Sequence, residues 1–173
     1  MSTSTTKPVT VSNLSKLDRA ELDVVERYAA EDRYISSVEV PWFPWVGALE
    51  IKLLRADNRN GQFVAGLRST EEAMLGKHRH RGAVSAVTLK GKWHYFEYDW
   101  MAAPGDYVRE NPGTIHTLHL FANTEIYFTV EGSIEFLNDD DTLRNTMDVW
   151  SFVHLYEDHC VKTGIEMNKR IFY

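Results

Sequence analysis

Alternation of hydrophobic and polar residues dominates the middle of this chain and predicts a series of short β-strands. Successive side chains of a strand point to opposite faces, so alternation allows one face to be buried. Turn sequences such as Asn58-Arg59-Asn60-Gly61 and Pro104-Gly105-Asp106 separate the runs. The predicted strands are Leu49–Arg55, Gln62–Ser69, Val84–Leu89, Lys92–Asp99, Ile115–Leu120, Ile126–Val130 and Ser133–Leu137. Many short strands at regular spacing favour an antiparallel sandwich or barrel over a parallel α/β sheet.

Helical periodicity is confined to the two ends of the chain. Residues 14–33 carry apolar positions at helical intervals with charged residues between them, and we expect this helix to pack across a sheet. A second helix is predicted from Thr146, as its N-cap, to about Lys162, with Gly164 as the stop. The architecture is therefore a β-barrel with a helix at each end.

The organisation predicted around these elements is simple. Residues 1–12 are polar and rich in Ser and Thr, which predicts a flexible leader, and residues 13–173 are predicted to form a single domain. The segment Pro41–Trp45 holds two prolines, which lack an amide donor, so it is predicted to be an extended edge or loop.

Composition narrows the classes of protein that fit. The chain has 173 residues, of which 43% are hydrophobic and 25% charged, as in ordinary globular domains. A net charge of −6 argues against a nucleic-acid partner, and no apolar run is long enough to span a membrane or to form a signal peptide. The single cysteine, Cys160, permits no internal disulfide and favours the cytoplasm.

Candidate chemistry is concentrated in the stretch Gly76–Gly91. Within it, His78 and His80 are two residues apart and would share one face of a strand. Two neutral imidazoles on one face suit a divalent metal such as Fe(II), Zn(II) or Mn(II). The alternative is a pair of exposed histidines on a basic turn.

Two further residues are candidates to complete such a site. His116 shares a strand face with Leu118 and Leu120, and a buried imidazole needs a partner, which a metal shared with the first two histidines would provide. A core histidine satisfied by an ordinary hydrogen bond is the alternative. Glu97, among aromatic residues, is the first choice for a carboxylate ligand, because burial would raise its pKa unless a cation offsets it.

These histidines sit in a two-part pattern that resembles the cupin superfamily. The first cupin motif places His-x-His after a glycine and closes on another glycine, as His78, His80 and Gly91 do here, but its glutamate position is occupied by Val84 or Ser85. The second motif is matched by Gly105, Gly113 and His116, with Asn111 at the usual proline position. The resemblance implies a jelly-roll barrel, or double-stranded β-helix.

Within that superfamily, several stretches of residues 34–164 resemble the 2,4'-dihydroxyacetophenone dioxygenase group. The resemblance implies a mononuclear non-haem iron enzyme that uses O2 to cleave the carbon–carbon bond beside a ketone carbonyl. It also implies His78, His80, His116 and Glu97 as the iron ligands, with Zn, Ni or Mn as alternative metals. A small aromatic or hydroxyketone substrate is expected, as is a homodimer or homotetramer.

Two other functions stay open at this point. Cupin domains of this type also occur in zinc-containing anti-sigma factors, where the barrel senses and does not catalyse. A metal-dependent isomerase or sugar-binding cupin is the third reading, although it would favour a more polar pocket and fewer tryptophans.

Overall fold

Two antiparallel sheets make up most of the structure. The computed structural model describes residues 13–173, so the predicted leader, residues 1–12, lies outside the described residues. The chain divides into two compact units, one that ends at Tyr34 and one that comprises Ile35–Tyr173. The prediction of one domain over residues 13–173 stays a prediction.

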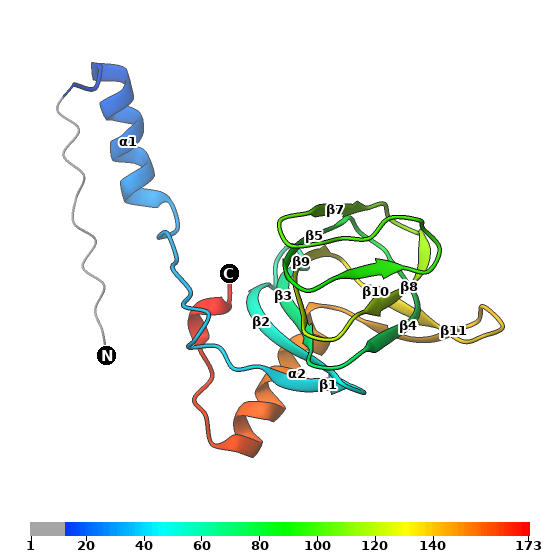
Figure 1. Cartoon of the computed structure of the whole chain (residues 1–173). Coiled ribbons are helices and arrows are strands. Elements are labelled where there is room, and N and C mark those ends of the chain that lie inside the picture. Colours follow the sequence, from blue (N-terminus) through cyan, green and yellow to red (C-terminus); the bar gives the residue numbers. More distant parts are fainter. Residues whose placement is uncertain (1–12) are drawn as a thin grey trace. The chain divides into compact units, whose positions relative to one another are not determined.

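The unit Ile35–Tyr173 is built from a six-stranded sheet, in the order β1-β2-β3-β9-β5-β7, and a five-stranded sheet, in the order β11-β10-β4-β8-β6 (Figure 1). The strands are β1 (Phe43–Val46), β2 (Leu49–Asp57), β3 (Gln62–Ser69), β4 (Ala73–His80), β5 (Val84–Lys90), β6 (Trp93–Tyr95), β7 (Tyr107–Glu110), β8 (Ile115–Leu120), β9 (Thr124–Glu131), β10 (Ile134–Leu137) and β11 (Leu143–Met147). This arrangement confirms the predicted mainly-β jelly roll.

Agreement with the predicted strands is best where alternation is regular. Strands β3 and β8 match their predicted bounds, and the proline-rich segment supplies β1, which lies at a sheet edge as expected. Strand β6 is shorter than predicted because a turn begins at Phe96. Strands β7 and β11 are short and largely exposed, so their sequences carry little of the alternation that would predict them.

The inward faces of the two sheets enclose an apolar core that is rich in aromatic rings. Phe43, Phe63, Trp93, Tyr95 and Tyr156 are all essentially buried. Removing each such side chain from water stabilises the fold by roughly 2 to 3 kcal/mol. The core therefore provides a water-poor environment for any polar group that points into it.

A bulge in β4 decides which of its side chains enter this core. Leu75 pairs with Leu118 of β8, but the next pair joins His78 with His116, so β4 carries one extra residue there. The bulge shifts the alternation, so that Leu75 is buried upstream of it and both His78 and His80 are buried downstream of it. A regular strand would place Leu75 and the two histidines on opposite faces.

The helices differ in how much of their surface is buried. Helix α1 (Lys16–Tyr28) begins at the N-cap Ser15 and has no buried residue, and its predicted packing across a sheet stays a prediction. Helix α2 (Val149–Thr163) packs against β1 and β2 through buried residues that include Phe152 and Tyr156, and a short 3-10 helix, η1 (Lys169–Ile171), follows it. Among the described residues 13–173, no helix has the length and apolar character needed to cross a membrane.

The predicted end of the C-terminal helix is confirmed and its predicted cap is wrong. Gly164 adopts the left-handed conformation that ends α2. Thr146, the predicted N-cap, lies within β11, and Asp148 caps the helix instead, with its side chain accepting from the Ser151 amide. The Ser151 hydroxyl in turn bonds the Asp148 amide, which completes a capping box.

Substitution of the two candidate caps distinguishes these assignments. Asp148→Ala should lower the free energy of unfolding by about 1 kcal/mol, because it leaves helix amides without a partner. Thr146→Ala, at an exposed strand position, should change it by less than about 0.5 kcal/mol. Urea denaturation of both variants measures the difference, and equal effects would contradict the assignment of Asp148 as the cap.

Candidate metal centre

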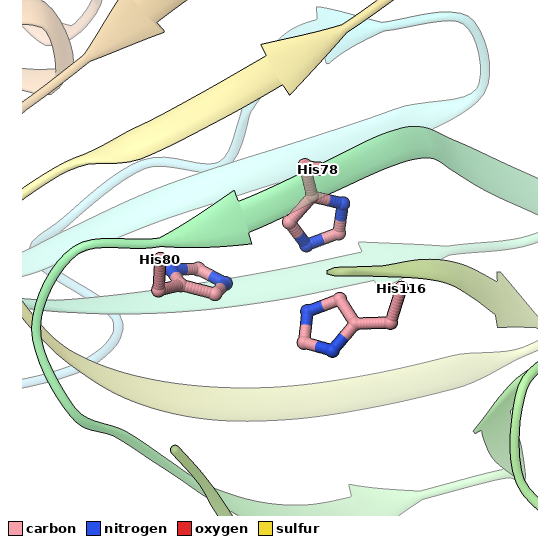
Figure 2. Close-up of side chains that lie close together, drawn as sticks. All are labelled: His78, His80 and His116. Atoms are coloured by element: carbon pink, nitrogen blue, oxygen red, sulfur yellow. The ribbon is translucent and has the colours of Figure 1, made fainter. Parts of the chain in front are cut away.

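Strands β4 and β8 bring three histidine side chains together inside the barrel. His78 and His80 come from β4, and His116 lies directly opposite His78 on β8. The ring centroids are 4.6 Å apart for His78 and His116, 5.2 Å for His78 and His80, and 5.7 Å for His80 and His116. Figure 2 shows the three rings turned toward one shared space. All three are buried, so the reading of an exposed pair on a basic turn is wrong.

The hydrogen bonds of the cluster leave ring nitrogens free to bind a metal. The Nδ1–H of His78 donates to the Gly76 carbonyl at 2.8 Å, which fixes the tautomer and leaves a lone pair on Nε2. His80 Nδ1 and His116 Nε2 are buried without a hydrogen-bond partner. One ligand atom from each histidine can be chosen so that all three lie within 4.8 Å of one another. A divalent cation fits this donor set, because it would give the unpaired nitrogens a partner.

A buried carboxylate that the sequence analysis did not select lies against the cluster. Glu110, on β7, places Oε2 at 3.4 Å from His80 Nε2 and 3.5 Å from His116 Nε2, and that oxygen has no hydrogen-bond partner. The other oxygen, Oε1, accepts a hydrogen bond from the Tyr95 hydroxyl. Tyr95 also stacks on the His116 ring, with centroids 3.8 Å apart and planes within 3°. One tyrosine therefore orients both the imidazole and the carboxylate.

Signals for Glu110 are present in the sequence but weak. The residue alternates with Val108 on a four-residue edge strand, and it directly precedes the Asn111-Pro112-Gly113 turn. An acidic residue beside such a turn is usually exposed to solvent. Its burial depends on the pairing of β7 with β5, which the local sequence does not reveal.

Glu97, the predicted carboxylate ligand, does not join the cluster in this structure. The strand that was expected to carry it ends at Tyr95, so Glu97 lies in a turn and is exposed. Its carboxylate accepts a hydrogen bond from the Thr117 amide at 2.9 Å. A ligand role for Glu97 stays a prediction.

Burial sets the protonation states at the site. Loss of water lowers the pKa of His78 to about 4 and that of His116 to about 3, and it lowers the pKa of His80 to about 2 with help from the two neighbouring rings. The three imidazoles are therefore neutral at pH 7, which is the form that binds metals. Burial raises the pKa of Glu110 to about 7, and the hydrogen bond from Tyr95 opposes that shift.

Two cavities of opposite character border the histidine cluster, and Tyr95 lines both of them. The inner one has a volume of about 40 Å³, exposes His78, His80 and Tyr95, and is otherwise walled by apolar side chains such as Phe128 and Phe152. The outer one has a volume of about 190 Å³ and is more polar, with lining residues that include Tyr98, Trp100, Arg109, Glu110, Thr114 and His116. The site therefore has a dry apolar side and a polar side.

A second pair of histidines lies apart from this centre. His94 Nε2 and His119 Nδ1 are 3.1 Å apart, and His119 Nε2 lies 2.7 Å from Glu72 Oε1. Each of these contacts is satisfied by one proton between the two atoms, so the pair needs no metal. The structure assigns no part in the three-histidine cluster to His94.

Comparisons with known proteins agree with this fold. The family model of the ChrR cupin-like domain matches residues 30–135. An RmlC-like cupin from Ralstonia eutropha JMP134 is 23% identical, covers 81% of this chain and 94% of its own, and superposes with a TM-score of 0.76. An acetylacetone dioxygenase from Acinetobacter johnsonii is 19% identical, covers 76% of this chain and 93% of its own, with a TM-score of 0.66. No curated protein matches the sequence. At these identities the structural matches show the fold alone, and they confirm the cupin architecture.

Acid should destabilise the metal-free protein. The three histidines have pKa values in the folded state that are below the ordinary value of 6.5, so the unfolded chain binds more protons as the pH falls through 6.5 toward 4. Glu110 acts in the opposite direction, because its pKa rises from 4.5 to about 7 on folding. The three histidines outweigh the one glutamate, so the free energy of unfolding should fall by on the order of 2 kcal/mol per pH unit between about pH 6 and 5.

Urea denaturation of the metal-free protein at pH 7, 6 and 5 measures the slope of the free energy of unfolding against pH. His154→Gln removes an exposed histidine and should leave the slope unchanged. A free energy of unfolding that stays flat or rises as the pH falls would contradict the burial of neutral imidazoles.

Proposed function

The chain belongs to the ChrR cupin-like family, and from that premise we propose that it is a mononuclear non-haem iron dioxygenase that cleaves the carbon–carbon bond beside a ketone carbonyl. One observation carries the proposal, namely three buried neutral imidazoles that converge beside a carboxylate and an apolar cavity. His78, His80 and His116 would hold the metal. Glu110, and not Glu97, would be the carboxylate that acts at the centre.

The reaction proposed is the oxidative cleavage of an α-hydroxyketone. In overall balance, R–CO–CH2OH and O2 give R–COOH and HCOOH: the bond between the two oxygen-bearing carbons breaks, and each carbon gains one oxygen atom. The substrate loses four electrons and O2 accepts them. Bound Fe(II) would supply redox chemistry and the coordination positions at which both reactants meet.

In this proposal, Glu110 would move the substrate proton. Its Oε2 faces the histidines without a hydrogen-bond partner, so it can accept the proton of a hydroxyl or enol group that binds there. Its Oε1 is held by Tyr95, which fixes the direction of the free oxygen. The stacking of Tyr95 on His116 would hold Glu110, the base, in a fixed orientation relative to His116, the metal ligand. These contacts favour proton transfer at Oε2.

The inner cavity suits a small apolar reactant. At about 40 Å³ it is far smaller than the cavity of about 150 Å³ that accommodates benzene in an engineered lysozyme. Its walls are apolar, which favours O2 over water. Exclusion of water there would protect reactive intermediates from side reactions.

A metal-binding sensor is the second candidate, because the family model that matches this chain is the ChrR cupin-like domain. A sensor needs the three-histidine cluster but has no use for a proton acceptor beside an O2-sized cavity. The acetylacetone dioxygenase that shares this fold supports the enzymatic reading only as an analogy.

Metal content and oxygen uptake separate the two candidates. We expect purified protein to hold about one iron per chain and to consume O2 when given aromatic α-hydroxyketones or β-diketones. His116→Ala should abolish metal retention, because it removes one of three ligands. Zinc in place of iron with no O2 uptake would favour the sensor, and full iron occupancy in His116→Ala would remove that residue from the site.

A matched pair of carboxylates tests the proton-transfer role. Glu110→Gln keeps the size and the hydrogen bond to Tyr95 but removes the base, so O2 uptake should fall by about 100-fold or more with metal content preserved. Glu97→Gln, on the exposed turn, should change it by less than about threefold. Single-turnover O2 consumption by the iron-loaded variants gives both values. The reverse order would restore Glu97 as the functional carboxylate.

A further inference from the structure

His94 and His119 lie on the outer face of the five-stranded sheet, away from the three-histidine cluster. His119 is on β8, three residues after His116, so the two side chains point to opposite faces of the strand. His94 is paired with His119 from the neighbouring strand β6. The two imidazoles therefore share a strand with the cluster but lie on the other side of the sheet.

Two nitrogens of this pair face each other at the separation expected of neighbouring metal ligands. His94 Nε2 and His119 Nδ1 are 3.1 Å apart. A zinc ion lies about 2.0–2.1 Å from an imidazole nitrogen, so an ion bound by both atoms would make an N–Zn–N angle of roughly 100°. That angle lies between those of octahedral and tetrahedral coordination. The pair can therefore chelate a divalent cation without movement of either strand.

A carboxylate on the far side of His119 turns the ring toward this role. Glu72 Oε1 lies 2.7 Å from His119 Nε2 and accepts its proton in a hydrogen bond, so the lone pair of the ring is on Nδ1 and points at His94. Histidines that bind metals commonly donate their other nitrogen to a carboxylate, which orients the ring and raises its basicity. In the metal-free protein the Nε2–H of His94 occupies the contact. A cation would take the place of that proton, which moves to His94 Nδ1.

Two phenylalanine rings restrain the pair. Phe96 stacks on His119 with ring centroids 5.1 Å apart and planes within 17°, and Phe121 stacks on His94 at 6.0 Å and 27°. Each phenyl ring also contacts the other imidazole, at 5.2 Å for Phe96 and 4.7 Å for Phe121. His119 is buried and His94 is partly exposed, so an ion can reach the pair from solvent. Because both imidazoles are already held in place, less conformational freedom is lost when an ion binds.

We propose that His94 and His119 form a second metal site, which takes a borderline divalent cation such as Zn(II) or Cu(II). His94 Nε2 and His119 Nδ1 are the ligands, Glu72 orients His119, and water completes the coordination. Imidazole nitrogens suit these cations, whereas Ca²⁺ and Mg²⁺ prefer oxygen ligands. Two ligands hold an ion more weakly than three, so added metal fills this site and purification empties it. The proposal does not rest on the proposed function, because it uses no residue of the three-histidine centre.

Zinc binding to the metal-free protein tests the second site. The untagged full chain is titrated with Zn(II) by calorimetry in a buffer that does not bind metals, and bound zinc is counted after equilibrium dialysis. We expect two zinc ions per chain in the wild type, one at each centre. His94→Gln and His119→Gln should each hold one zinc fewer, because a single imidazole lacks the chelate effect of a pair. His94 is the less buried of the two, so His94→Gln is the variant that disturbs folding least.

Matched variants serve as controls for both the histidines and the carboxylate. His154→Gln removes an exposed histidine whose Nδ1 lies 3.7 Å from the Glu157 carboxylate, and it should leave the zinc count at the wild-type value. Glu72→Ala should weaken the second zinc by about 10-fold. Glu71→Ala, at the neighbouring exposed position, should leave its affinity unchanged. Equal zinc content in the wild type and His94→Gln, an equal loss in His154→Gln, or equal affinities in Glu72→Ala and Glu71→Ala would each contradict the proposal.

His116→Ala separates this site from the three-histidine centre. The variant should lose the zinc of that centre and keep the second zinc, because His116 lies on the other face of β8. Addition of His94→Gln to this variant should remove the remaining zinc. A His116→Ala protein that binds no zinc would overturn the second site, whereas O2 uptake by the iron-loaded wild type would be unaffected by that result.

Discussion

Burial of three imidazoles in an apolar barrel is the constraint on which the functional site depends. Loss of water holds all three neutral, and the cluster keeps a nitrogen on two of them without a hydrogen-bond partner. Each unpaired buried polar atom costs roughly 1 to 3 kcal/mol. A cation shared by the three rings would offset that cost, because it would give the unpaired nitrogens a partner. The burial that sets the stability of the metal-free protein would therefore also set its affinity for a metal.

The rest of the local structure serves to hold that geometry. The bulge at Gly76 and Lys77 moves His78 and His80 onto the buried face of β4, and cross-strand pairing sets His116 opposite His78. Tyr95 then locks the His116 ring by stacking and the Glu110 carboxylate by a hydrogen bond. The orientation of the site comes from four strands that are distant in sequence, β4, β6, β7 and β8, so it is a property of the whole barrel.

Sequence reasoning predicted what regular alternation can encode. A period of two in the sequence predicts the sandwich. The same period predicts that His116 points inward and that His78 and His80 share a face, and the structure confirms these positions. The sequence does not reveal which carboxylate lies at the cluster. The strand predicted to carry Glu97 ends at Tyr95. Glu110 lies on a short edge strand, and its burial depends on the pairing of that strand with β5. The cap of α2 was misplaced for a similar reason, since Thr146 has cap-forming chemistry but pairs in β11. The local pattern of a sequence predicts which face of a strand is buried, but it does not predict where a strand or helix ends.

For the proposed dioxygenase, the asymmetry of the two cavities favours a carboxylate on β7 over one on the apolar side of the cluster. Glu110 borders the polar outer cavity, where a proton can exchange with solvent through neighbours such as Thr114. The inner cavity is lined by His78 and His80 and by apolar side chains, and a proton carrier there would bring water with it. Proton transfer on the polar side would let the base work without hydrating the inner cavity, which is the space proposed for O2. A carboxylate inside the inner cavity would lose that separation, because its own hydration would fill the space.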